Sequence, residues 1–428
     1  MYKEAFKKGQ LYVNYLSPFS ALLGNLIATP ILISNLGLKH WSLFALINIL
    51  FPLIYFILFG SSEIVRRLMI NIFLENKKTA ESIKIFYKYE QKILIRFIFG
   101  VLFLSAALII LNSNNYPFFK GIKFTFFFIA IAVLINIFGF YYAELLNGLK
   151  QHYKLHIWAF VITVFKWFTI IYLSYLSEIN INILILAVIV FSCFLLVIQR
   201  IFISNIFKNK INQLSNQKNE IIPEFNENNF GMIIILFLLT QQFYKVLTFG
   251  ILDPISISYF AIAFMISSAI PLTISPIIVY LTPEIYESVE LKSIKRKKYF
   301  SRLINVQFVI LVSLIIIINL NLEKILSIWI GKNINFFEIS SFLIPLSVIT
   351  LSISIINTLK ILFVAENQII LMKKPLALVF CLFVSLTIGV YLQILTVKSY
   401  LYCYSISMLI LMIYFYFIFY KRIYMLIK

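Results

Sequence analysis

The sequence predicts an all-α polytopic membrane protein with about twelve transmembrane helices in two parallel six-helix bundles. Three observations lead to this fold class. Of the 428 residues, 61% are hydrophobic and 13% are charged. Apolar runs near the roughly 20 residues that a helix needs to cross a bilayer recur along the chain. A polar segment near the middle separates six of these runs from the other six.

The individual spans follow from a sliding hydropathy window of about 19 residues, which gives twelve candidates. Their limits are 11–34, 41–62, 93–111, 124–146, 157–176, 182–203, 230–250, 256–282, 303–320, 339–360, 375–395 and 400–420. Prolines lie within several spans or at their ends, where we expect them to bend or break helices, as alternating access requires. They are Pro18, Pro30, Pro52, Pro271, Pro276, Pro345 and Pro375.

Lysine and arginine gather on one side of this topology. With the N-terminus, the even-numbered loops and the C-terminus on that side, 28 of the 37 cations lie there, 6 lie opposite, and 3 lie within spans. Because cytoplasmic loops carry the excess of Lys and Arg, both termini are expected to be cytoplasmic. The same asymmetry accounts for the net charge of +20, so nucleic acid is not an expected partner.

The polar segment at residues 204–229 lies between the sixth and seventh spans. It divides the chain into an expected N-terminal bundle, residues 1–215, and an expected C-terminal bundle, residues 216–428. The second span of each half opens with a similar tetrapeptide, SLFA at 42–45 and SYFA at 258–261. Since six is an even number, such halves would be parallel repeats related by an axis along the membrane normal.

Polar residues share one helix face in four of the spans. Asn25 and Asn48 belong to such stripes in the first two spans, and Gln241, Tyr244 and Lys245 share one in the seventh. A polar face indicates a cavity or hydrogen bonding between helices, and four stripes together favour a cavity. The sixth and twelfth spans show little of this pattern and are expected to face lipid. The stripe of the tenth span consists of Ser347, Thr350, Ser354 and Asn357.

Lys166 and Lys245 lie within the fifth and seventh spans. A lysine at the bilayer centre costs about 2.5 to 3.5 kcal/mol on insertion scales, so it usually faces protein or water. Lys166 is near the centre of its span, whereas Lys245 is nearer to the outer end, where snorkelling is an alternative. Arg66 and Arg67 follow the second span beside Glu63; they form either an interfacial cluster or a site for bidentate phosphate binding.

Acidic residues are scarce where a cation would need them. Of the seventeen, only Asp253 is an aspartate, and none is expected deep within a span. This argues against a carboxylate proton relay and against a pocket for organic cations. His152 and His156 lack a third metal ligand, so no metal site is expected. The prediction is a polar cavity with a positive bias for an anionic substrate, without a cofactor, and with coupling to an H+ or Na+ gradient left open.

The first hairpin resembles the opening of bacterial oligosaccharide flippases of the O-antigen (Wzx) type. It reads GNLIATPILISNLGLKHWSLFALINILFPL from residue 24, and FGSSEIVRR follows from residue 59. YYAELLNGLKQHYK at 141–154 and TQQFYKVLTFGILDPISISYFAIAF at 240–264 also resemble segments of that family. The family commonly has an acid beside the basic residue of the seventh span. Tyr244 stands there beside Lys245, which argues against a buried ion pair and against ion coupling through it.

The resemblance implies a V-shaped alternating-access transporter of the multidrug/oligosaccharidyl-lipid/polysaccharide exporter superfamily in the bacterial inner membrane, and not an enzyme. Its substrate would be an undecaprenyl-diphosphate-linked oligosaccharide, moved to the periplasmic leaflet for O-antigen (lipopolysaccharide) or capsule assembly. Membrane lipids and a polysaccharide polymerase are further expected partners. The residues expected to attract the diphosphate are Lys166, Lys245, Arg66 and Arg67.

Two alternatives stay open. A membrane polysaccharide polymerase or ligase generally carries a large periplasmic loop with acids, Arg and His. The longest outward loop here, 321–338, has two acids, no Arg and no His. A multidrug exporter of the same superfamily is disfavoured because no membrane-embedded carboxylate is expected.

Overall fold

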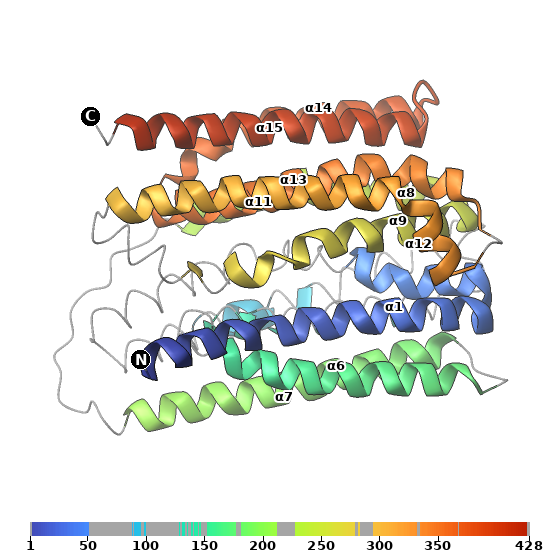
Figure 1. The fold of residues 1–428 in the computed structure, drawn as a ribbon, viewed down its shortest axis with the longest axis horizontal. Coiled ribbons are helices and arrows are strands. Elements are labelled where there is room, and N and C mark those ends of the chain that lie inside the picture. The colour runs from blue at the N-terminus through green and yellow to red at the C-terminus, as the bar shows by residue number, and fades with distance from the viewer. Residues whose placement is uncertain are drawn as a thin grey trace. The chain divides into compact units, whose positions relative to one another are not determined.

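The elements of the fold are all helices in the part of the chain that the structure describes. The computed structural model describes residues 2–50, 152–176, 181–211, 227–278, 281–282, 294–331, 334–366 and 368–425, and scattered positions between 88 and 146. The helices are α1 (Tyr2–Leu50), α6 (His152–Ser174), α7 (Ile181–Ile211), α8 (Glu227–Ile251), α9 (Pro254–Leu272), α11 (Ile294–Leu320), α12 (Leu322–Trp329), α13 (Phe336–Ala365), α14 (Lys373–Tyr391) and α15 (Val397–Met425), with a 3-10 helix, η3, at Ile369–Met372 (Figure 1). The prediction of an all-α membrane protein is confirmed.

Eight of the described helices are long and apolar enough to cross a membrane. They match the first, fifth, sixth and eighth to twelfth predicted spans. Helix α8 covers the seventh, and its apolar part within the described residues is Met232–Gln242. The second, third and fourth predicted spans lie largely outside the described residues.

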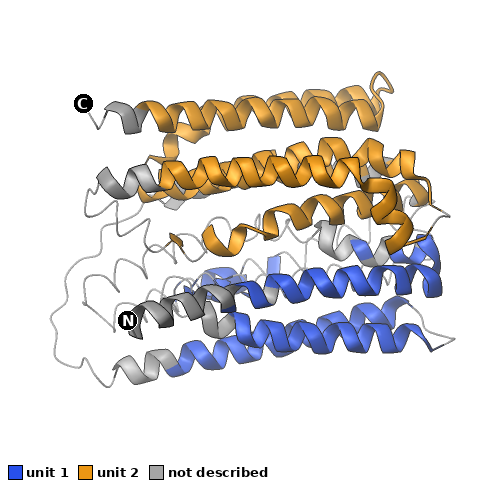
Figure 2. Cartoon of the chain, viewed as in Figure 1, with its two compact units in different colours: residues 1–231 blue, residues 232–428 orange. Residues whose placement is uncertain are grey.

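The chain forms two compact units, residues 1–231 and 232–428 (Figure 2). In unit 1, α6 packs against α1 on one side and α7 on the other. In unit 2, α13 packs against α9, α11 and α15, and α14 packs against α15. The predicted division between residues 215 and 216 falls outside the described residues and stays a prediction.

Helix α1 consists of two helices that meet at Gly37. This glycine has φ 76° and ψ 160°, far from helical values. A positive φ of this size is readily adopted by glycine and disfavoured for residues with a Cβ. The turn between the first two predicted spans, which end at 34 and begin at 41, therefore lies at Gly37.

The prolines behave in two ways. Pro18 and Pro30 lie inside α1, and Pro345 lies inside α13, in helices that continue past them. Proline removes a backbone donor, and membrane helices tolerate it where neighbouring groups satisfy the freed carbonyl. Helix α9, by contrast, ends one residue after Pro271, and a turn at Thr273 and Ile274 follows. Of these four prolines, Pro271 is the one that coincides with a helix end.

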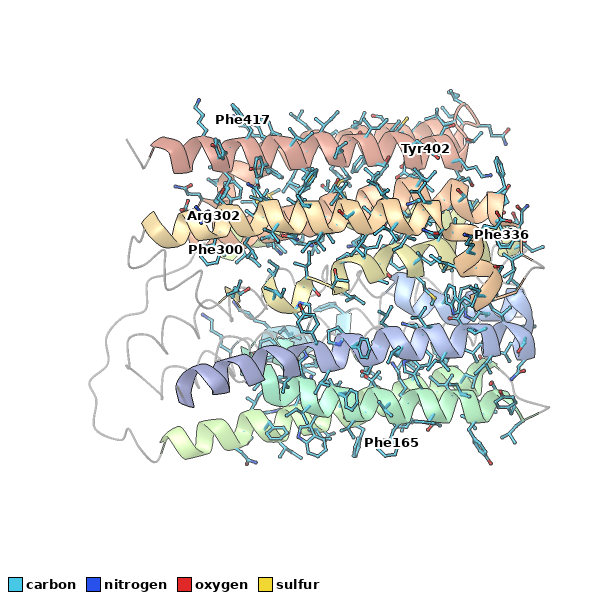
Figure 3. The ribbon with its side chains drawn as sticks, in the orientation of Figure 1. Phe165, Phe300, Arg302, Phe336, Tyr402 and Phe417 are labelled. Carbon is cyan, nitrogen blue, oxygen red and sulfur yellow. The ribbon has the colours of Figure 1, made fainter. Side chains whose placement is uncertain are left out.

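The sixth and twelfth spans present apolar stripes to their surroundings, in agreement with the expected contact with lipid. On α7 the exposed stripe is Ile183, Leu186, Val190, Phe194, Val197 and Ile201. On α15 it is Tyr402, Ile406, Ile410, Ile413, Phe417 and Tyr420, of which Tyr402 and Phe417 are labelled in Figure 3. Spacings of three and four residues place each set on one helix face.

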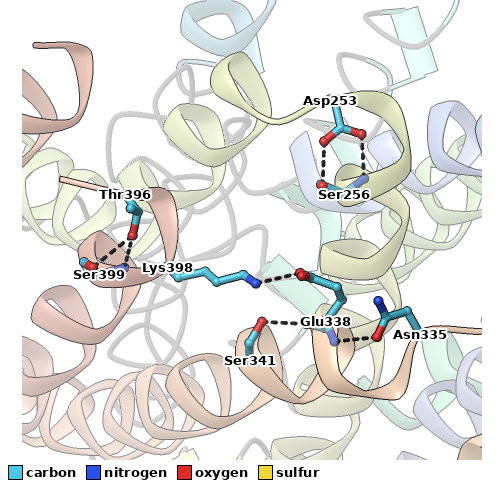
Figure 4. A network of polar contacts seen from close by, with 8 residues as sticks. All are labelled: Asp253, Ser256, Asn335, Glu338, Ser341, Thr396, Lys398 and Ser399. Atoms are coloured by element: carbon cyan, nitrogen blue, oxygen red, sulfur yellow. Dashed lines mark hydrogen bonds and ion pairs between the residues drawn. The ribbon is translucent and has the colours of Figure 1, made fainter. Parts of the chain in front are cut away.

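Three helices of unit 2 begin at side-chain caps. Asp253 accepts hydrogen bonds from two backbone N–H groups at the start of α9, and Asn335 and Thr396 each accept one at the starts of α13 and α15 (Figure 4). Such caps satisfy donors that have no partner within the helix. The starts of α13 and α15 are joined by the ion pair between Glu338 and Lys398, with Nζ 2.7 Å from the carboxylate.

Candidate functional site

Lys245 is buried in unit 2 without an ion-pair partner among the described residues. Its side chain is 5% exposed. The ammonium Nζ lies 4.3 Å from the ring centroid of Phe264 on α9 and 5.8 Å from that of Tyr244. Contact with an aromatic face contributes about 0.5 to 2 kcal/mol, which is less than the several kcal/mol that burial of an ion costs. The side chain is therefore enclosed rather than snorkelled, and an anionic ligand would stabilise it.

One helical turn before Lys245, two glutamines have unused hydrogen-bonding capacity. Gln241 is 3% exposed, and its Nε2 has no hydrogen-bond partner among the described residues. The Oε1 of Gln242 is likewise buried without one. A buried polar group without a partner costs about 1 to 3 kcal/mol. The predicted site residues Gln241 and Lys245 thus come together on α8 as groups that a polar, anionic ligand could satisfy.

Tyr244 contacts α15 instead. Its ring centroid lies 5.1 Å from that of Tyr404, which stacks on Phe383. The Tyr404 hydroxyl donates a hydrogen bond to the backbone carbonyl of Thr240 on α8. These contacts explain the burial of Tyr244 by packing between helices, and its predicted contact with substrate stays a prediction.

In the polar stripe of the tenth span, Ser354 forms a hydrogen bond to a neighbouring helix and Ser347 does not, among the described residues. The Gln307 side chain on α11 donates to Ser354 at 2.9 Å and accepts from Thr358 at 3.0 Å, which joins α11 to α13. For Ser354 the interpretation as hydrogen bonding between helices therefore holds. Ser347 differs, because its hydroxyl oxygen is buried without a hydrogen-bond partner in the described part of the chain.

In unit 1, Lys166 and Asn25 lie beside a close contact between α6 and α1. A Cβ added to Gly24 would lie 2.0 Å from Cδ1 of Trp167, so the indole packs directly on the α1 backbone. Lys166 is half-buried, and its Nζ lies 5.0 Å from the Trp167 ring centroid. Asn25 follows Gly24 and is half-buried too. No described carboxylate forms an ion pair with Lys166.

The remaining predicted site residues are not placed. Asn48 belongs to α1, but its side chain lies outside the described part of the chain, as do Arg66 and Arg67 altogether. Their substrate contacts stay predictions. Lys166 belongs to unit 1 and Lys245 to unit 2.

Two polar contacts were missed by the sequence analysis. Arg200 on α7 makes two contacts with the carboxylate of Glu90, Nε to Oε1 at 3.0 Å and Nη2 to Oε2 at 3.2 Å, and the Tyr142 hydroxyl donates to Oε1 at 2.7 Å. These residues are far apart in sequence, so no local pattern predicts the contact.

Lys360 was predicted at the inner limit of the tenth span, whereas α13 continues to Ala365 and holds this lysine within the helix.

The fold is shared with solved membrane transporters. No family model and no curated protein sequence matches the chain. A MATE transporter in its straight conformation has a TM-score of 0.64 at 13% identity, covering 98% of this chain and 96% of that chain. An inward-facing multidrug resistance MATE transporter of the MOP superfamily has a TM-score of 0.59 at 14% identity, covering 97% and 98%. The Vibrio cholerae MATE transporter VcmN has a TM-score of 0.60 at 10% identity, covering 99% and 98%.

The structural likeness establishes the fold, and sequence identities this low leave the substrate open. The coverage extends over nearly the whole length of this chain and of each of those transporters. This likeness shows the fold alone, and the predicted superfamily stays a prediction. The chain is a polytopic membrane protein with the fold of MATE-type transporters of the MOP superfamily.

Proposed function

We propose that the protein is a flippase for an undecaprenyl-diphosphate-linked oligosaccharide repeat unit. It would move the unit from the cytoplasmic to the periplasmic leaflet of the bacterial inner membrane for O-antigen or capsule assembly, with both termini in the cytoplasm. The observation that carries this proposal is Lys245, a buried cation without a carboxylate partner among the described residues of a chain with a transporter fold.

The chemistry of a diphosphate matches the needs of this lysine. An ammonium group binds phosphate as a point charge, and hydrogen bonds to charged groups contribute about 1.5 to 3 kcal/mol. The nearby Nε2 of Gln241 supplies a neutral donor for a phosphate or sugar oxygen. Lys166 offers a second ammonium in unit 1, also without an ion pair to a described carboxylate. An organic cation would be repelled by both lysines.

Substitution of the two lysines tests the proposal in cells. With Lys245→Ala we expect surface polysaccharide and translocation of repeat units to fall about tenfold or more, because one charge-assisted contact is lost. Lys166→Ala should act in the same direction, and Lys245→Arg should retain activity. The matched control is Lys398→Ala, since Lys398 also lies near an aromatic ring of unit 2 but is paired with Glu338. Each variant is compared at equal amounts of protein in the membrane. Full activity of both lysine-to-alanine variants would contradict the charge assignment.

A multidrug exporter is the second candidate, because similar solved structures include a multidrug resistance transporter. The two functions separate by the charge of the substrate. Deletion of the gene should leave sensitivity to cationic dyes unchanged and should remove surface polysaccharide. Hypersensitivity to the dyes with normal polysaccharide would favour the exporter. Polymerisation of lipid-linked units by the purified protein would instead favour a polymerase or ligase.

The energy source and the partners belong to the same proposal. The protein would need no resident cofactor, and whether an H+ or Na+ gradient drives transport is open to test. Collapse of each gradient in turn with an ionophore identifies the coupling ion, because only loss of the coupled gradient should stop translocation. Membrane lipids would surround the spans, and a polysaccharide polymerase would use the translocated units.

A further inference from the structure

Helix α12 lies between two membrane-spanning helices of unit 2. Helix α11 ends at Leu320, and α12 begins two residues later at Leu322. The next span, α13, begins at Phe336, and α12 packs against both spans. Figure 1 shows α12 at an angle to the long helices, at the end of unit 2 where α11 ends. The connections on its two sides therefore hold α12 at the boundary of the membrane.

The eight residues of α12 form a polar face and an apolar face. With 3.6 residues per turn, Glu323, Lys324 and Ser327 share one side of the helix. Glu323 and Lys324 are exposed. The apolar residues occupy the rest of the circumference, and they are Leu322, Ile325, Leu326, Ile328 and Trp329. A helix of this kind can lie between water and an apolar medium.

The protein covers only part of the apolar face. Two leucines of α12 are buried in unit 2, whereas Ile328 is 86% exposed. The exposure of apolar side chains continues on both sides of α12 along the chain, where Leu320 and Phe337 are each 79% exposed. Several large apolar side chains exposed around one short helix indicate an apolar partner rather than water.

A second segment of unit 2 at the same level is also apolar and exposed. The turn between α14 and α15 exposes Tyr391, Leu392 and Ile394. The ion pair between Glu338 and Lys398 joins the starts of α13 and α15, so this turn lies level with the start of α13 (Figure 4). Tyrosine and tryptophan are enriched where a membrane meets water. Two separate segments thus indicate that this level is the interfacial region of a bilayer.

The exposed surface of α12 is continuous with the exposed stripe of α11. Spacings of three, four and seven residues place that stripe on one helix face, and it ends beside α12. Its residues are Val306, Val309, Ile310, Ile316, Ile317 and Leu320. Because α11 is long and apolar enough to span a membrane, lipid is the medium that would cover this stripe. The same lipid would reach Ile328 without a change of partner.

We propose that α12 is an interfacial helix that lies in the plane of the bilayer, with Ile328, Leu320 and Phe337 inserted among the lipids. Its partner is the boundary between phospholipid headgroups and acyl chains. Glu323 and Lys324 face water and headgroups, where the ammonium of Lys324 can pair with a lipid phosphate. The inference does not depend on the transported substrate, so it stands apart from the flippase proposal.

The test measures the depth of spin labels on α12 in the full-length protein in phospholipid nanodiscs. Cys193, Cys381 and Cys403 are first replaced by serine, because they would take the label too. A nitroxide is attached at Ile328→Cys, or at Glu323→Cys as the matched control on the polar face. Its collisions with oxygen, which concentrates in lipid, are compared with those with a water-soluble nickel chelate. We expect the Ile328 label about 5 to 10 Å into the interface between headgroups and acyl chains, and the Glu323 label in water.

Phe337→Cys provides a second labelled position in case the label at Ile328 disturbs α12, and we expect the same depth for it. If the Ile328 and Phe337 labels meet the nickel chelate as often as the Glu323 label does, this face is in water and the proposal is wrong. If both are shielded from oxygen and from the chelate, a protein covers the face and the proposal is also wrong. Spectral broadening between labels would then identify that protein as a second copy of this chain. Neither result would affect the flippase proposal.

Discussion

Lys398 and Lys245 of unit 2 differ in whether a carboxylate pairs with their charge, and this difference decides how much an added anion would stabilise each of them. Lys398 is half-exposed, lies 5.7 Å from the ring centroid of Phe342, and pairs with Glu338 at 2.7 Å. Lys245 also lies over aromatic rings, but it is buried and no described carboxylate pairs with it. An exposed ion pair contributes at most about 1 kcal/mol to stability, whereas a buried charge without a partner opposes folding. Of these two lysines, Lys245 is therefore the one whose energy an anion would lower more.

Gly24 tests the packing that positions Lys166. The added methyl group of Gly24→Ala would overlap the Trp167 indole, at 2.0 to 2.5 Å from the ring atoms. Because the indole would have to move, we expect the variant to lose about 1 to 3 kcal/mol of stability. The loss should appear as a lower midpoint of thermal unfolding in detergent.

Gly139→Ala is the control for this substitution. A Cβ there would have its nearest neighbours at 3.8 Å, an ordinary contact distance. Alanine is also favoured over glycine inside a helix by about 1 kcal/mol. The control should therefore unfold at or above the wild-type midpoint. Equal midpoints for the Gly24 variant and the wild type would show that α1 and α6 are not packed as described.

Local chemistry sets the ends of the helices in unit 2. Asp253 accepts from the backbone N–H groups of Ile255 and Ser256 at 2.9 and 3.1 Å, and from the Ser256 hydroxyl at 2.6 Å. Proline follows at the first position of α9, where its missing N–H has no intrahelical role. These hydrogen bonds hold the pKa of Asp253 below its ordinary value, and the bond from the Ser256 side chain has the largest effect.

The cap of α9 is expected to be sensitive to pH. Because the pKa of Asp253 is lower in the folded protein, its contribution to stability is present above the ordinary aspartate pKa and is lost as pH falls through the folded value. Asp253→Ala should cost about 0.5 to 2 kcal/mol at neutral pH. Unfolding midpoints measured between neutral and strongly acidic pH for the wild type and Asp253→Asn provide the test.

Asp253→Asn serves as the control because the amide oxygen still caps the helix and does not titrate. The wild type should lose stability relative to this variant as the solution becomes acidic. Parallel curves across the whole pH range would show that the aspartate makes no charged contact in the folded protein.

The elements that could be predicted from the sequence are those that depend on neighbouring residues. The turn at Gly37 lies between the predicted limits of the first two spans, and the start of α9 after Asp253 lies between those of the seventh and eighth, because glycine, aspartate and proline act on their own backbone. The Tyr404 bond to Thr240 and the contact of Trp167 with Gly24 depend on helices far apart in the chain. No hydropathy period contains that information. The C-terminal end of α13 was misplaced for a related reason, because Lys360 lowers hydropathy although its ammonium lies near an aromatic ring.

At the scale of the whole molecule, each unit holds a lysine that lies within a predicted span and has no ion pair with a described carboxylate, Lys166 in unit 1 and Lys245 in unit 2. The class of membrane transporter fold was predictable, because hydropathy and the distribution of Lys and Arg report spans and sides directly. The substrate was not predictable in the same way, since ligand recognition depends on the side chains that tertiary packing brings together. The sign of the charge in the membrane-embedded part is the property of this chain that bears on the substrate most directly.

Translocation of a lipid-linked sugar by the purified protein tests the central claim most directly. Proteoliposomes would carry either undecaprenyl-diphosphate-linked N-acetylglucosamine or a cationic dye, with the wild-type protein, Lys245→Gln or Lys398→Gln. The proposal predicts movement of the lipid-linked sugar and not of the dye, a rate about tenfold or more lower for Lys245→Gln, and a normal rate for Lys398→Gln. Transport of the dye without the sugar, or an unchanged sugar rate for Lys245→Gln, would contradict it.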